Sequence, residues 1–231
     1  MYIGAKVMMM RAFMSALTLC AICAGGGAHG SQQLAGEAGW EDALASFAAA
    51  DLKRTPEPGG VLFVGSSSIR LWDNLESEFA DARIIKRGFG GSRLSDCVQL
   101  LDRLVIRYQP RTVLLYAGDN DLAEGSTPEE VLERVKAFAN GVHSRLPETR
   151  VAFISIKPSP ARQALIARAR AANRLVESYA ATHASFDYID VFTPMLTADG
   201  SPRRELFRTD ALHLNEAGYA LWRTIIRPFV R

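Results

Sequence analysis

The sequence predicts a single α/β domain in which a parallel β-sheet has helices on both faces. Short apolar runs alternate with longer segments of helical periodicity from about residue 61 to residue 230. This alternation is typical of parallel sheets whose strands are joined by right-handed crossovers. The 231 residues show no internal repeat and no second composition regime. A chain of this length can bury a core without disulfide support.

The first part of the domain is predicted as helix, strand, strand. Residues 39–53 carry Trp40, Leu44 and Phe47 at helical spacing, and the Pro/Gly-rich residues 55–60 break that helix. Residues 61–64 form a continuous apolar run before Gly65, as expected for a strand buried on both faces. Residues 83–86 are the second strand, and they lead into a glycine-rich loop that must bend sharply or approach another group closely.

The middle of the chain continues the alternation. Residues 92–108 are predicted as one helix, which Pro110 stops, and residues 112–117 as the third strand. Residues 128–146 form the next helix, since Thr127 is a good N-cap and Pro128 suits the first helical position.

The C-terminal part completes a five-stranded sheet. It is predicted as a strand, a long helix, a strand, an irregular loop and a last helix, which cover residues 151–156, 161–184, 186–191, 192–209 and 215–230. In the last helix, Leu221, Ile225 and Phe229 recur one turn apart, as expected for a face that packs on the sheet.

The N-terminus resembles a secretory signal. Lys6 and Arg11 precede an uncharged run over residues 12–24, and small residues follow through Gly30. We expect residues 1–30 to be removed from a bacterial periplasmic or secreted protein, leaving a domain over residues 31–231. A retained anchor is the alternative, but the run is short of the roughly 20 residues that span a bilayer. The mass of the exported chain tests this expectation.

The remaining domain has no net formal charge and one cysteine. Loss of Lys6 and Arg11 leaves 25 basic residues, which equals the number of acidic ones. We therefore expect no nucleic-acid partner, which would need a basic surface, and no stable membrane insertion after cleavage. Cys97 lies in an apolar helical pattern and is expected to be a buried, unreactive thiol. The oligomeric state stays open.

Four polar clusters lie after predicted strands or before the last helix. They are Ser66–Ser68, Gly90–Ser92, Asp119–Asp121 and Asp210–His213. The carboxyl ends of parallel strands share one edge, so the first three must emerge there together. The last helix could return the fourth cluster to the same edge, and in a helical turn Asp210 and His213 would face the same side.

These clusters contain the groups that nucleophilic catalysis needs. A serine becomes an effective nucleophile when a histidine takes its proton and a carboxylate orients the imidazole. His213 is the histidine with an acid three residues away, whereas His143 and His183 lie in predicted helices and suit solvated or capping roles. Ser66–Ser68 could instead simply cap a helix.

Donors for a developing oxyanion are also available. The backbone at Gly90-Gly91 can be approached without side-chain obstruction, and the amide of Asn120 supplies a further donor. Each of these residues also suits an ordinary tight turn.

The four clusters resemble, in order, the Ser, Gly, Asn and His blocks of the SGNH (GDSL-type) hydrolase superfamily. The resemblance covers roughly residue 61 to the C-terminus and implies a flavodoxin-like three-layer fold. Gly65-Ser66-Ser67-Ser68-Ile69 implies Ser67 as nucleophile, and Asp210-Ala211-Leu212-His213 implies His213 as base with Asp210 as its orienting acid. The usual Gly-Asp-Ser-Leu is altered here, so Ser66 or Ser68 remains an alternative nucleophile.

The same resemblance implies the oxyanion hole. Gly88-Phe89-Gly90-Gly91-Ser92 places a donor at Gly91, and Gly118-Asp119-Asn120-Asp121 places one at Asn120. The amide of Ser67 would be the third donor. No metal and no cofactor are implied.

The sequence therefore predicts an exported serine esterase or acylhydrolase. The Ser-Ile-Arg-x-Trp continuation is similar to bacterial acylhydrolases near the platelet-activating-factor acetylhydrolase branch, which implies short, acetyl-like acyl groups. No long insertion suggests a lid, so the ester could belong to a small molecule or to a polymer. The alternatives are a thioesterase or acyltransferase on the same triad, a non-catalytic glycan-binding module, and a flavin or nucleotide binder.

Overall fold

The computed structural model describes Met1 and residues 27–230, with side chains from residue 40 onward. Most of the predicted signal segment lies outside the described residues, so its removal stays a prediction. Within the described residues, five parallel strands form one sheet in the order β2-β1-β3-β4-β5, which confirms the predicted α/β class. The strands are β1 (Val61–Gly65), β2 (Ile84–Gly88), β3 (Thr112–Tyr116), β4 (Arg150–Ile154) and β5 (Phe186–Ile189).

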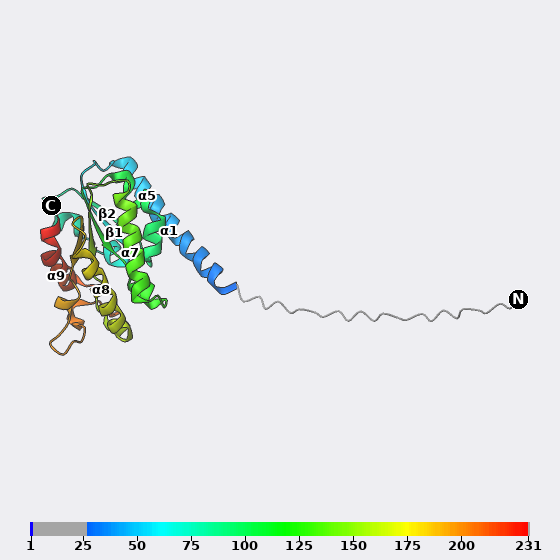
Figure 1. Ribbon diagram of the computed structural model, residues 1–231. Coiled ribbons are helices and arrows are strands. Elements are labelled where there is room, and N and C mark those ends of the chain that lie inside the picture. Colours follow the sequence, from blue (N-terminus) through cyan, green and yellow to red (C-terminus); the bar gives the residue numbers. More distant parts are fainter. Residues whose placement is uncertain (2–26, 231) are drawn as a thin grey trace.

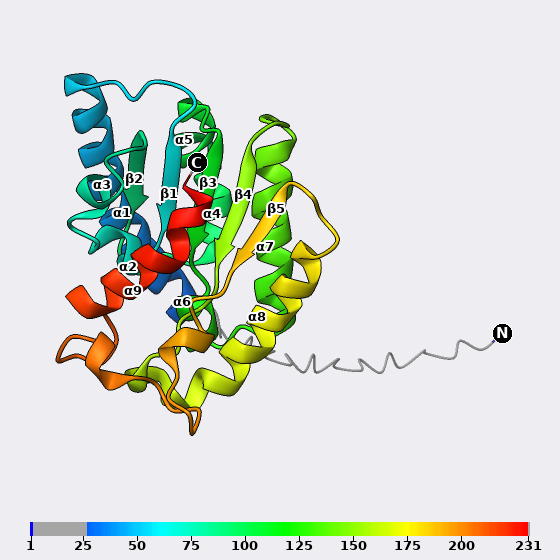
Figure 2. The same ribbon diagram turned by 90° about the vertical axis from the view of Figure 1, so that its left-hand side faces the viewer.

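Helices cover both faces of this sheet, which gives three layers (Figure 1; Figure 2). One face is covered by α1 (Gly27–Lys53), α4 (Leu94–Gln99), α5 (Leu101–Leu104), α7 (Pro128–His143) and α8 (Ile166–Ala180). The other face is covered by α2 (Ser67–Arg70), α3 (Leu75–Glu78) and α9 (Glu216–Ile226). The short α6 (Asp119–Ala123) follows β3 at the carboxyl edge of the sheet.

Short 3-10 helices complete the connections. They are η1 (Ile106–Tyr108), η2 (Pro160–Leu165), η3 (Thr193–Met195), η4 (Arg204–Leu206) and η5 (Arg227–Phe229). Two of them, η3 and η4, lie in the segment that was predicted to be an irregular loop.

The strands feed two separate hydrophobic cores because alternate side chains of a strand point to opposite faces. In β1, Leu62 and Val64 join the core under α1, α4, α5, α7 and α8, whereas Val61 and Phe63 join the core under α2, α3 and α9. Strands β3 and β4 divide their residues in the same way. The continuous apolar runs in the sequence are therefore strands buried on both sides.

Several helices differ in extent from the prediction. Helix α1 begins at Gly27 rather than at residue 39, and the helix predicted over residues 92–108 is three pieces. The backbone leaves helical geometry at Leu100 (φ −96°, ψ 15°) and again at Val105 (φ −130°, ψ −59°). Hydrophobic periodicity shows which side chains face the core. Consecutive short helical turns keep the same side chains on the core side, so the periodicity does not show where one helix ends and the next begins.

The thiol of Cys97 is buried in the core, as predicted. Burial raises its pKa well above the ordinary value, and the neighbouring Asp96 adds to the effect. The described part of the chain contains no helix that combines the length and the apolar character needed to cross a bilayer.

The last position of β1, Gly65, requires glycine both for its backbone conformation and for the space around it. Its φ is +133°, and an ideal Cβ at this position would lie 1.8 Å from the backbone oxygen of Tyr116 on β3. That same oxygen accepts a hydrogen bond from the Ser66 amide over 2.9 Å. Gly65 therefore lets the chain turn tightly against β3 two residues before Ser67.

We expect Gly65→Ala to lower the free energy of unfolding by about 3 kcal/mol or more, because the added methyl must displace backbone. Gly125→Ala is the matched control, since Gly125 also has a positive φ (+102°) but nothing within 4 Å of an ideal Cβ. It should cost only about 1 kcal/mol of backbone strain. Urea unfolding of both variants measures the difference, and equal losses would contradict the close-contact argument.

Candidate active site

Ser67 is the first residue of α2, directly beyond the carboxyl end of β1. Ser66 and Ser68 are buried at 0% and 1% exposure, whereas Ser67 is partly exposed. Ser66 occupies the N-cap position, but its side chain makes no capping hydrogen bond. Of the three serines, Ser67 is the one whose hydroxyl solvent can reach.

Aromatic packing against α9 fixes the turn that carries Ser67. The hydroxyl of Tyr219 donates to the carbonyl of Ser68 over 2.9 Å, and the ring of Tyr219 stacks on Trp72 with centroids 5.1 Å apart. Trp222 packs edge-on against Trp72. Buried aromatic pairs of this kind add stability beyond their buried area, so the residues after β1 are held firmly to the helix that follows His213.

The structure brings Ser67, His213 and Asp210 together. Nε2 of His213 lies 3.1 Å from the Ser67 hydroxyl oxygen, and Nδ1 lies 2.7 Å from Oδ2 of Asp210. The carboxylate fixes the proton on Nδ1, so Nε2 accepts from the serine hydroxyl. Ser67 and His213 are 146 positions apart in the chain.

Asp210 is held ionised by its contacts. The His213 ring holds the pKa of this carboxyl well below its usual range, and backbone amides add to the effect. Oδ1 accepts from the amides of Leu212 and His213 over 2.9 and 3.0 Å. The two carboxylate oxygens therefore have different partners. Oδ1 accepts from backbone amides of the loop, and Oδ2 accepts from the imidazole.

The expectation that Asp210 and His213 share a helical turn is wrong. They lie in a non-helical turn, and Ala211 between them has a positive φ of 56°. The two side chains meet because the backbone amides of Leu212 and His213 hydrogen-bond to Oδ1 of Asp210, which bends the chain into a turn. Short polar side chains often stabilise turns in this way. The amide of Arg208 also donates to the carbonyl of His213 over 2.8 Å, which closes the loop.

The predicted oxyanion residues lie at the same edge. Strands β1 and β3 are neighbours in the sheet. After β1 the chain continues to β2 on one side of this pair, and after β3 it continues to β4 on the other side. Ligands of open α/β sheets bind at such a change of direction in the strand order. Asn120 follows β3, and its Nδ2 donates to the carbonyl of Ser92 over 3.0 Å. Gly91 is exposed with a φ of +75°, and nothing lies within 4 Å of an ideal Cβ there. Its backbone is therefore open to an approaching group.

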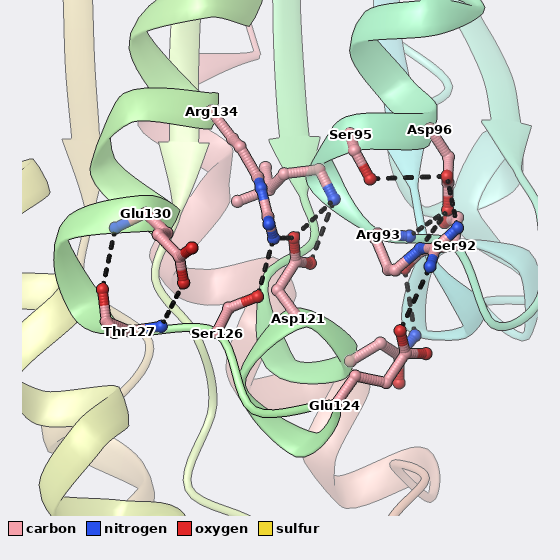
Figure 3. A network of polar contacts seen from close by, with 12 residues as sticks. Ser92, Arg93, Ser95, Asp96, Asp121, Glu124, Ser126, Thr127, Glu130 and Arg134 are labelled. Atoms are coloured by element: carbon pink, nitrogen blue, oxygen red, sulfur yellow. Dashed lines mark hydrogen bonds and ion pairs between the residues drawn. The ribbon is translucent and has the colours of Figure 1, made fainter. Parts of the chain in front are cut away.

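A buried carboxylate links these two loops (Figure 3). Asp121 accepts from the amide of Leu94 over 3.0 Å and from Nη1 of Arg134 over 2.7 Å. Arg134 also donates to the Ser126 hydroxyl over 2.8 Å. Burial raises the pKa of Asp121 despite these donors. The carboxylate ties the residues after β3 to the start of α4, next to the glycine loop.

The sequence reasoning missed a cluster of charged residues beside Asn120. Nζ of Lys157 and Nη1 of Arg162 each lie 3.1 Å from Oδ2 of Asp119, and Arg162 also contacts Asn120. Lys157 and Arg162 follow β4, whose carboxyl end lies at the same edge as those of β1 and β3. Their position after a strand was the signal that could have identified them.

The two other histidines whose side chains the structure describes lie elsewhere. His143 is partly buried with Nε2 3.1 Å from the carbonyl of Thr149, and His183 is exposed against the ring of Tyr179. In the described part of the chain, no group of three or more His, Cys, Asp or Glu side chains could hold a metal ion.

Known proteins resemble this chain in sequence and in fold. Residues 60–221 match the model of the GDSL-like Lipase/Acylhydrolase family. The platelet-activating factor acetylhydrolase IB subunit alpha1 of Bos taurus and that of Homo sapiens are each 26% identical over 198 residues, which is 81% of each chain.

Solved structures share the fold. A protein from Streptococcus pneumonia superposes with a TM-score of 0.76 at 22% identity, over 89% of this chain and 100% of the other. A GDSL-like lipase from Bacteroides thetaiotaomicron has a TM-score of 0.69 at 19% identity, over 81% of this chain and 96% of the other. The family match spans well over half of the sequence, including the Ser67, Gly91, Asn120 and His213 segments, and the chain therefore belongs to the GDSL-like lipase/acylhydrolase family.

Proposed function

We propose that this chain is a serine esterase that hydrolyses short-chain carboxylic esters through an acyl-enzyme on Ser67. One observation carries the proposal: the His213 imidazole lies 3.1 Å from the Ser67 hydroxyl on one side and 2.7 Å from the Asp210 carboxylate on the other. Those distances allow proton transfer from the serine as it attacks.

Acylation uses the imidazole twice. Oγ of Ser67 attacks the ester carbonyl carbon while Nε2 of His213 takes the hydroxyl proton. The carbonyl oxygen becomes negative and is held by the amides of Ser67 and Gly91 and by Nδ2 of Asn120. When the tetrahedral intermediate collapses, the bond to the alcohol oxygen breaks and His213 returns the proton to the leaving alcohol.

Deacylation repeats the sequence with water. His213 removes a proton from a water molecule that attacks the acyl carbon, and the Ser67 oxygen leaves with a proton from the same imidazole. The products are a carboxylic acid and the free enzyme. Asp210 stays ionised throughout, because its contacts favour the carboxylate, and it stabilises the imidazolium that forms in both halves.

The expectation of a short acyl group has two supports. The relatives of similar sequence are named acetylhydrolases. The turns that carry Ser67 and Asn120, from β1 to α2 and from β3 to α6, are only a few residues long. Such connections leave little chain to cover a long acyl group.

A series of p-nitrophenyl esters from acetate to palmitate tests this proposal. We expect kcat/KM to be highest for acetate or propionate and to fall at least about 10-fold by octanoate, since an acyl group without a matching pocket gains no transition-state contacts. Equal or better turnover of long chains would contradict the short-chain assignment. Absence of turnover on every ester would contradict the esterase assignment itself.

A further inference from the structure

The carboxamide of Asn120 is held from both ends. Nη2 of Arg162 donates to Oδ1 of Asn120 over 2.8 Å, and Nδ2 of Asn120 donates to the carbonyl of Ser92 over 3.0 Å. A carboxamide rotated by half a turn would point its NH₂ group at the guanidinium and its oxygen at a carbonyl, so the two contacts select one orientation. An NH₂ group carries two hydrogens, and the second is left for a ligand.

Arg162 is itself anchored by buried charge. Its Nη1 lies 3.1 Å from Oδ2 of Asp119, and Nζ of Lys157 lies at the same distance from that oxygen. Lys157 and Asp119 are both buried. Burial alone would raise the pKa of Asp119, but the charges of Lys157 and Arg162 outweigh it and the pKa is lowered. The two cations and one carboxylate leave a net positive charge beside Asn120.

The segment that carries Arg162 also contacts the loop of residues 210–213, which contains Asp210 and His213. The amide of Ala161 donates to the carbonyl of Ala211 over 3.0 Å, and Ala211 lies between Asp210 and His213. One short stretch of η2 therefore contacts both the Asn120 side and the His213 side of the site.

The contacts of Arg162 favour a role in support of Asn120 rather than a contact with substrate. Its guanidinium is engaged by both Asn120 and Asp119, and its side chain is only 22% exposed.

We propose that Arg162 is a positioning residue of the oxyanion hole, which holds the Asn120 carboxamide with Nδ2 toward the cleft and polarises that N–H. The inference rests on the proposed function, because it needs Asn120 to act as an oxyanion donor. The guanidinium draws electron density toward Oδ1, which makes the opposite N–H a stronger donor to the negative oxygen of the transition state.

Steady-state kinetics on p-nitrophenyl acetate, a neutral ester, test the proposal. We expect Arg162→Ala to lower kcat about 10-fold to 100-fold with KM within about 2-fold, because the lost orientation affects the transition state more than ground-state binding. Asn120→Ala should lower kcat about 10²-fold to 10³-fold. Combining the two should lower kcat no further than Asn120→Ala alone, within about 2-fold, since residues that act as a unit are not additive.

Two further variants guard against a folding artefact. Arg162→Lys keeps the charge next to Asp119 but lacks the forked guanidinium that reaches two partners. It should lower kcat in the wild-type background and have no effect in the Asn120→Ala background. Arg168→Ala, an exposed arginine of α8, is the matched control and should leave kcat unchanged.

Additive losses in the double variant, or an unchanged kcat in both Arg162 variants, would overturn the proposal while leaving the esterase assignment intact. An unchanged kcat in Asn120→Ala would also overturn it, since there would be no oxyanion amide to position. Failure of the esterase assignment would be separate and visible, because the wild-type protein would then turn over no ester.

Discussion

Ser67→Ala should lower kcat for ester hydrolysis by about 10⁴-fold or more, since removing the nucleophile of a triad leaves only the catalysis supplied by binding and oxyanion donors. The substitution removes one oxygen from a partly exposed position, so the unfolding midpoint should stay near that of the wild type. Rates on p-nitrophenyl acetate and thermal melts measured by circular dichroism check both expectations.

The neighbouring serines provide matched controls. Ser66→Ala and Ser68→Ala each remove the same oxygen from a buried position and should retain hydrolysis. A fluorophosphonate probe should label the wild type and both controls on the peptide that contains Ser67, and it should not label Ser67→Ala. Labelling of Ser67→Ala, or loss of activity in a control that still folds, would assign the nucleophile elsewhere. A folded wild type that is neither labelled nor active would favour a non-catalytic module.

Asp210→Asn is expected to have the next largest effect, a loss of about 10³-fold to 10⁴-fold in kcat, because the imidazole would adopt the wrong tautomer. Oδ1 of Asp210 accepts two backbone amides, whereas Oδ2 accepts Nδ1 of His213. If the asparagine keeps its oxygen toward the amides, its NH₂ group faces Nδ1. The ring proton then moves to Nε2, which can no longer accept from the Ser67 hydroxyl.

The control for this substitution is Asp73→Asn, since Asp73 is exposed on the same domain. It should keep wild-type activity, and both variants should melt near the wild-type temperature. An Asp210→Asn variant with at least a tenth of wild-type kcat would show that the carboxylate does not control the tautomer.

The sheet was predictable because its strands are buried on both faces. Continuous apolar runs such as residues 61–64 are typical of strands buried on both faces, and the turn residues after each run mark the strand ends. The meeting of Ser67 and Asn120 at one edge then follows from parallel topology alone. The resemblance points to Ser67 as the candidate nucleophile, and the structure adds that Ser67 is partly exposed whereas Ser66 and Ser68 are buried.

Position after a strand could have marked Lys157 and Arg162 as candidates, but the contacts they make could not be predicted, because those contacts join distant segments. Asp119, Lys157 and Arg162 are each unremarkable in a pattern of charges. Their association is visible only in the fold, where Lys157 and Arg162 each lie 3.1 Å from Asp119. The Asp210 turn was mispredicted for a related reason. Helical spacing suggested that Asp210 and His213 share a face, but the carboxylate forms the turn through hydrogen bonds that no periodicity encodes.

The enclosed sulfur atom of Cys97 has a practical consequence for separating the esterase from the thioesterase alternative. Because the thiol is buried and burial disfavours the thiolate, a folded preparation without residues 1–30 should give almost no background with an aromatic disulfide reagent. The coenzyme A or thiocholine released from an acyl thioester can then be followed continuously by the colour that this reagent develops. Oxygen and sulfur esters of the same acyl group can be compared on one enzyme sample, in the same cuvette.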